Sequence, residues 1–152
     1  MANYYNMADQ VRAFSMIHET TAGDTDVDAH KVLDMAGYEG VLFVGSLKTV
    51  TAAGEAQIQL QMSDSSSTTD MVDTTAGAAG STATSTDHEL KTILLDVYRP
   101  QKRYVSCRLW RNTQVSEASV VALQYGPLYA PVTQSTEQYG CIQAYSVATP
   151  TT

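Results

Sequence analysis

Residues 103–111 have the sequence Arg-Tyr-Val-Ser-Cys-Arg-Leu-Trp-Arg, in which apolar and polar side chains alternate. Val105, Cys107 and Leu109 fall on one face of an extended strand, because successive side chains of a strand point to opposite sides. Trp110 falls on the opposite face, together with polar neighbours. The stretch therefore predicts a strand whose apolar face packs on a core, as expected in an all-β protein.

The same patterns recur along the chain. Residues 56–62 (AQIQLQM) alternate, with three apolar side chains predicted inward and the glutamines outward. Residues 41–44 (VLFV) are a continuous apolar run between Gly40 and Gly45, which predicts a strand buried on both faces. No segment gives a convincing helix, so we expect an all-β sandwich or barrel that forms a single domain over residues 1–152. Strands are predicted over residues 11–18, 41–44, 56–62, 92–98, 103–111 and 120–125, with a short strand and turn at 31–35.

Three segments are expected to lie outside this framework. Residues 63–89 consist almost wholly of Ser, Thr, Asp, Ala and Gly, which predicts one long polar loop with at most a short strand at residues 71–72. Shortening residues 74–86 should then leave the thermal midpoint nearly unchanged, since loop length enters stability only logarithmically. Residues 1–9 are interpreted as an extended N-terminal arm, and residues 131–152 as an extended C-terminal tail.

The charge distribution excludes some functions. The chain carries a formal net charge of −7, and residues 1–90 hold 13 acidic against 3 basic side chains. This acidity argues against nucleic-acid binding, which needs a positive face toward the phosphates. There is no apolar run long enough to span a membrane and no basic-then-apolar leader, so we expect a soluble protein made in the cytoplasm.

No catalytic pattern is visible. The three histidines stand far apart, and the aspartates at 24–28 lack the glycine and glutamate that a calcium-binding EF-hand loop requires. These aspartates and those at 64–73 are interpreted as solvated acids of turns. We therefore expect no enzymatic activity, no metal and no cofactor. Cys107 and Cys141 could form one disulfide at most; a reducing cytoplasm favours two free thiols, and the pairing stays open.

Aromatic and basic residues are the candidates for protein contacts. Tyrosines outnumber phenylalanines nine to two, and interfaces favour such amphipathic rings. Five of the nine basic residues fall within residues 99–111. Trp110 could contact a partner protein, or it could belong to the core if the inward face of its strand is the other one. The candidate interface residues are Tyr4, Tyr5, Arg99, Lys102, Arg103, Arg108, Trp110, Arg111 and Tyr129.

Three stretches together carry a resemblance: residues 37–44 (GYEGVLFV), 95–105 (LDVYRPQKRYV) and 121–127 (VALQYGP). In this order and spacing the chain resembles, over about residues 31–134, the small capsid-decorating (cement) proteins of tailed bacteriophages. The resemblance implies a β-sandwich of jelly-roll type that binds the major capsid protein on the outer surface of the virion. It also implies a homo-oligomer, a dimer or a trimer, without catalytic residues. The chain departs from the family pattern at residues 128–130 (Leu-Tyr-Ala), where members often carry basic residues.

A second hypothesis is a carbohydrate-binding β-sandwich on a phage tail or fibre. In that case Trp110 and several tyrosines would stack on sugar rings. The two hypotheses differ in copy number, since a decoration protein covers the head and a sugar-binding protein is present in few copies on the tail.

Overall fold

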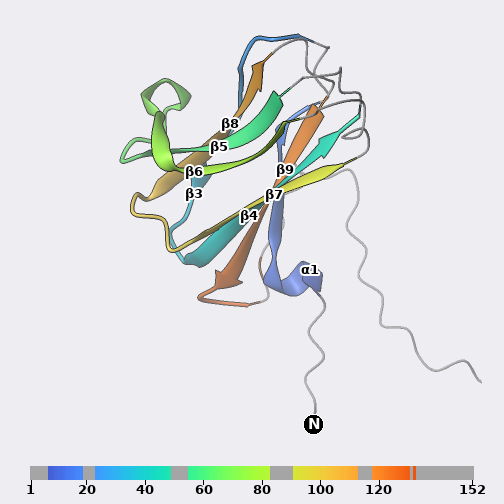
Figure 1. Ribbon diagram of the computed structural model, residues 1–152. Coiled ribbons are helices and arrows are strands. Elements are labelled where there is room, and N and C mark those ends of the chain that lie inside the picture. Colours follow the sequence, from blue (N-terminus) through green and yellow to red (C-terminus); the bar gives the residue numbers. More distant parts are fainter. Residues whose placement is uncertain are drawn as a thin grey trace, which may run out of the picture.

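The computed structural model describes residues 7–18, 23–48, 55–82, 91–112, 118–130 and 132, with side chains described for all of these except 75–82 and 112. The described chain is almost entirely β, and two antiparallel sheets pack face to face (Figure 1). The first sheet has the strand order β1 (Arg12–Ile17), β9 (Ala118–Pro127), β4 (Tyr38–Leu47) and β7 (Thr92–Tyr98). The second sheet has the order β2 (Val27–Asp28), β8 (Tyr104–Asn112), β5 (Glu55–Ser63) and β6 (Val72–Thr82), and β3 (Leu33–Asp34) also pairs with β8.

The strand pairs are nested along the chain. β5 pairs with β6, β4 with β7, β2 and β3 with β8, and β1 with β9, so the chain forms one long folded-back ribbon. The ribbon is rolled so that β4 also pairs with β9 and β5 also pairs with β8. This is the arrangement of a jelly roll, and it confirms the expected all-β sandwich of jelly-roll type.

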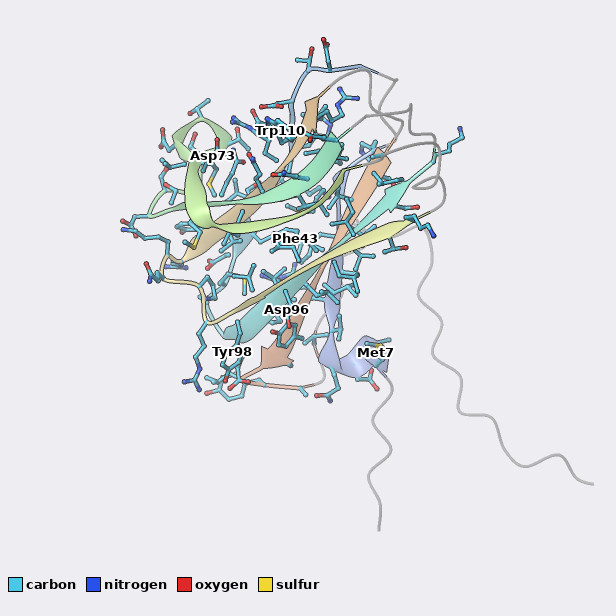
Figure 2. The ribbon with its side chains drawn as sticks, in the orientation of Figure 1. Met7, Phe43, Asp73, Asp96, Tyr98 and Trp110 are labelled. Carbon is cyan, nitrogen blue, oxygen red and sulfur yellow. The ribbon has the colours of Figure 1, made fainter. Side chains whose placement is uncertain are left out.

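The core lies between the sheets and comes from the inward side chains of both. Val105, Cys107 and Leu109 are buried on β8, which confirms the inward face predicted for residues 103–111. Ile58 and Leu60 on β5 are buried opposite them, as predicted. From the first sheet, Phe43 is fully buried and lies between the two layers in Figure 2. Further buried residues are Phe14, Met16, Ile17, Leu33, Val41, Leu47, Ile93, Val120 and Ala122.

The long polar loop predicted for residues 63–89 is wrong over its central part. Val72–Thr82 form β6, which pairs with β5 from Glu55 opposite Thr82 to Met62 opposite Val72, with one irregularity in register. Residues 64–71 connect the two strands and contain a 3-10 turn, η1 (Thr68–Asp70). A strand at the edge of a sheet depends on backbone hydrogen bonds to its neighbour, so a composition that cannot build a core is still compatible with a strand. Residues 83–90 lie outside the described residues.

The predicted arms are only partly described. Met7–Gln10 form one helical turn, α1, so the end of the predicted N-terminal arm is helical and not extended. Residues 1–6 lie outside the described residues, as does the predicted tail from residue 131 except for Val132. The Val132 amide donates a hydrogen bond of 3.0 Å to the Asp9 carbonyl, which brings the beginning of the tail beside α1. In the described part of the chain, no helix has the length and apolar character that crossing a membrane requires.

Two predicted side-chain environments differ from the structure. Gln61 was expected to face outward beside the other glutamines of β5, but only 3% of it is exposed. Its amide nitrogen donates to Asp28 of β2 and to Asp73 of β6. Residues 41–44 were expected to be buried on both faces; Val41 and Phe43 are buried, whereas Leu42 and Val44 are only half-buried on the outer side.

Candidate functional site

The turn between β7 and β8, residues 99–103, presents three cations at one end of the sandwich. Arg103 forms a two-point ion pair with Asp34, with Nε–Oδ1 and Nη2–Oδ2 distances of 2.9 and 2.7 Å. Lys102 donates to Asp64, on the connection between β5 and β6. Both pairs are solvent-exposed, so each contributes little to the free energy of unfolding. Charges that are held in place but remain accessible can still contact a partner.

The pKa of the Asp34 carboxyl is lowered, chiefly because it accepts hydrogen bonds from Arg103. A backbone hydrogen bond from the Ala36 amide acts in the same direction, while partial desolvation opposes both. The same pairing raises the pKa of Arg103. Asp34 therefore stays ionised and orients the Arg103 guanidinium. The position of Asp34 is itself fixed, because Asp34 of β3 pairs with Tyr104 of β8.

Arg99 differs from the other two cations of the turn. It has a positive φ of 50°, a conformation that costs energy for a residue with a side chain. Its backbone amide donates to the Glu39 carbonyl at 2.8 Å, and its guanidinium lies 5.1 Å from the centre of the Tyr98 ring. Within the residues that the structure describes, Arg99 has no ion-pair partner.

A shallow depression of about 470 Å³ adjoins the turn. Met35, Ala36 and Tyr38 form its apolar part, and the turn residues 99–103 form its polar rim. The three cations predicted as candidates, Arg99, Lys102 and Arg103, are thus brought to one place. Their acidic partners were not foreseen, because Asp34 and Asp64 lie 69 and 38 residues away in sequence.

Arg108 does not belong to this turn and lies on the outer face of the second sheet. It contacts Asp28 Oδ1 from Nε at 2.6 Å and Asp73 Oδ2 from Nη1 at 2.6 Å. The Gln61 amide nitrogen donates to the same two aspartates. The hydrogen bond from Arg108 is the main reason that the pKa of Asp28 is lowered, against some desolvation. This network ties β2 and β6 to β8 and β5, so its arrangement indicates a structural function.

Trp110 and Arg111 are adjacent on β8, so their side chains lie on opposite sides of the sheet and have different environments. Trp110 is half-buried on the outer face, opposite Gln57, which excludes the interpretation in which its face is the core (Figure 2). Arg111 is buried, and its Nε donates to the Thr25 carbonyl at 2.8 Å. Its backbone amide is also 3.4 Å from Asp26 Oδ1. Arg111 therefore anchors the segment before β2 and is not an accessible contact residue.

The candidate tyrosines have different outcomes. Tyr129 is 85% exposed in the segment that follows β9. Tyr4 and Tyr5 lie outside the described residues.

Cys107 is buried in the core, and burial raises the pKa of its thiol to about 12, so it is not a reactive group. Cys141 lies outside the described residues.

The chain matches no model of a protein family and no curated protein. Among solved structures, it is similar to one described as "Crystal structure of PirA", with a TM-score of 0.36 and 14% sequence identity, over 83% of this chain and 100% of that chain. A similarity of that size supports no conclusion about function, so the function has to be argued from the chain itself.

Proposed function

We propose that this protein binds the outer surface of an assembled tailed-phage capsid and stabilises it by bridging neighbouring major capsid proteins. The resemblance of residues 37–44, 95–105 and 121–127 to capsid-decorating proteins supports this function, and the jelly-roll topology is the fold that the resemblance implies. In the folded chain the first stretch pairs with both of the others, on β7 and on β9. The stretches that carry the resemblance therefore form one contiguous part of the molecule.

The observation that carries the proposal is the cationic turn on an otherwise acidic protein. Residues 99–103 lie at one end of the sandwich beside a depression with an apolar part, and Arg99 has no acidic partner among the described residues. An acidic side chain of a shell protein could enter the depression and pair with Arg99. Such a contact gives orientation and electrostatic attraction at modest cost in desolvation.

Binding to heads tests the proposal. Purified protein is mixed with heads that lack it, and the bound fraction is measured by co-sedimentation at low and at high salt. We expect Arg99→Glu to weaken binding about tenfold at low ionic strength, and less at high salt, because exposed charges are screened beyond about 10 Å at 0.1 M. The control is Lys91→Glu, which reverses an exposed charge directly before the opposite end of β7 and should bind like the unchanged protein.

Two results would contradict the proposal. Absence of binding to heads at any salt concentration would reject the function itself. Unchanged binding of Arg99→Glu would remove the turn from the contact. A specific loss of sugar binding in Trp110→Ala, from a protein that does not bind heads, would instead support the carbohydrate-binding alternative, since Trp110 lies on the outer face of β8.

A further inference from the structure

Two tyrosines flank a glycine on the outer side of the first sheet. Gly40 of β4 stands opposite Tyr98 of β7 and opposite Tyr125 of β9. Directly paired residues project from the same side of a sheet, so the two tyrosines leave the sheet on either side of a position without a side chain. A Cβ atom at residue 40 would lie 2.3 Å from Cζ of Tyr125, so the glycine is what allows this close approach. The Tyr125 ring therefore lies across Gly40.

The hydroxyl of Tyr125 reaches a carboxylate on the far strand of this row. It donates a hydrogen bond of 2.7 Å to Asp96 Oδ1, on β7. Desolvation and this hydrogen bond raise the pKa of Tyr125 to about 12, so the hydroxyl remains a donor at neutral pH. In the part of the chain that the structure describes, Asp96 forms no ion pair. One oxygen of the carboxylate is thus held in place, and the other can accept hydrogen bonds from a ligand.

Tyr98 provides an accessible aromatic face beside this carboxylate. It is 57% exposed, and Figure 2 shows it with Asp96 on β7, in the opposite layer from Trp110. Asp96 and Tyr98 are two residues apart and on the same side of the strand, a spacing of about 6.8 Å, or about the width of one sugar ring. A ring that stacks on Tyr98 therefore has its edge beside Asp96.

The charges around Tyr98 disfavour a charged ligand. The Arg99 guanidinium lies 5.1 Å from the centre of the Tyr98 ring, so a cation placed on this ring would meet another cation. An anion in the same position would meet the Asp96 carboxylate, which has no counter-ion among the described residues. A neutral ligand with hydroxyl groups can donate to the carboxylate and accept from the guanidinium. A sugar has this chemistry, and the apolar C–H face of its ring can pack on an aromatic side chain.

We propose that Tyr98, Asp96 and Tyr125 form a binding site for a neutral carbohydrate on the outer side of the first sheet. The sugar ring stacks on Tyr98, and its hydroxyls donate to Asp96. Tyr125 orients the carboxylate and extends the aromatic surface toward β9. The site is separate from Trp110, which lies on the outer side of the second sheet. It is also separate from the depression beside the basic turn, which neither Tyr98 nor Asp96 lines, so it can be tested without a capsid.

Saturation-transfer NMR of the full-length protein with soluble oligosaccharides tests the site. The neutral probes are oligomers of glucose, of galactose and of N-acetylglucosamine, and the charged probes are sialyllactose and sulfated glucose oligomers. We expect transfer to at least one neutral probe and none to the charged ones. Titration of the neutral probe should give a Kd of about 1 mM, because an open site makes few contacts.

Variants separate stacking from hydrogen bonding. Tyr98→Ala should weaken binding at least about tenfold, whereas Tyr98→Phe keeps the aromatic ring and should bind like the unchanged protein. Asp96→Asn still accepts from Tyr125 but should weaken binding about fivefold, since a carboxylate is the stronger acceptor. The matched control is Trp110→Ala, which removes an aromatic ring from the other sheet and should not change the Kd. Thermal midpoints of the Tyr98 and Asp96 variants should stay within about 3 °C of the unchanged protein, since both side chains are exposed.

Four results would overturn the assignment. Absence of saturation transfer to every neutral probe would reject the site, and so would a preference for the charged probes. Weakening by Tyr98→Phe as strong as that by Tyr98→Ala would show that stacking is not the contact. A loss of binding in Trp110→Ala, with Tyr98→Ala unchanged, would place the sugar on the second sheet. Binding to heads is measured separately, so none of these results decides the capsid function.

Discussion

The ion pairs of Arg108 are less exposed on the cationic side than those of Lys102 and Arg103, so the loss of Arg108 should cost more in the free energy of unfolding. Arg108 is partly buried and pairs with Asp28 and Asp73, and both aspartates also accept hydrogen bonds from Gln61. Arg108→Gln leaves two carboxylates close together without their counter-ion, so we expect a loss of about 1–2 kcal/mol in the free energy of unfolding. Lys102→Gln breaks a more exposed pair and should cost about 0.5 kcal/mol or less. Urea unfolding of both variants measures the difference, and equal losses would show that the network adds nothing to its separate pairs.

Asp34 gives the protein a dependence on acid pH whose sign follows from its lowered pKa. In the unfolded chain the pKa of an aspartate is about 3.9. Because the pKa of Asp34 is lower in the folded chain, the folded chain binds fewer protons at this carboxyl. The stabilisation is therefore complete above about pH 4 and is lost as the pH falls through the folded-state pKa. Asp34→Asn should lower the thermal midpoint at pH 7, and the difference from the unchanged protein should shrink as the pH falls below about 4. Asp70→Asn, an exposed acid on η1, is the control and should not lower the midpoint over the same pH range. A midpoint difference for Asp34→Asn that stays constant as the pH is lowered would contradict the electrostatic origin of the effect.

At the scale of elements, strands with large apolar side chains, in alternation or in continuous runs, could be predicted, whereas β6 could not. Residues 103–111 carry the period of two in large side chains, so β8 and its inward face follow from the sequence alone. β6 has no such signal, since its glycines, alanines and threonines are small and its place depends on pairing with β5. The residues of the candidate site also fall into a part that the sequence could predict and a part that it could not. The cations of the turn are adjacent in sequence, whereas Asp34 and Asp64 reach them only through the rolled pairing of distant strands.

β6 should matter for stability more than the connection that precedes it. Deleting residues 74–82 removes most of the pairing with β5, and with several backbone hydrogen bonds at about 1 kcal/mol each we expect a loss of about 3 kcal/mol or more. That corresponds to about 10 °C in the thermal midpoint. Replacing residues 65–70 by a shorter linker keeps both strands and should change stability by about 0.5 kcal/mol at most. Calorimetry of the two variants measures the difference. An unchanged thermal midpoint after deletion of 74–82 would show that this segment is dispensable for the fold, as its composition predicts.

At the scale of the whole molecule, the surface divides into regions of different chemistry. One end carries the basic turn, the outer side of the second sheet carries the Arg108 network beside Trp110, and the outer side of the first sheet is largely apolar. A protein that lies between other proteins needs separate surfaces for separate neighbours. The basic turn and the largely apolar outer side of the first sheet are separate surfaces in this sense, because they involve different residues.

The last prediction concerns the assembled head. A protein that binds the complete shell and not its separated subunits stabilises the shell by mass action, by about 2.7 kcal/mol per site at a hundredfold excess over Kd. Many sites that bridge neighbouring capsid proteins would then oppose the pressure of packaged DNA. Heads lacking this protein should still assemble but release DNA at a lower temperature and more readily on osmotic shock, measured by dye access to the DNA during heating. Adding back the unchanged protein should restore the release temperature, and Arg99→Glu should restore it less completely at low salt than at high salt. Heads that resist heat and shock equally well without the protein would show that it does not act as a cement.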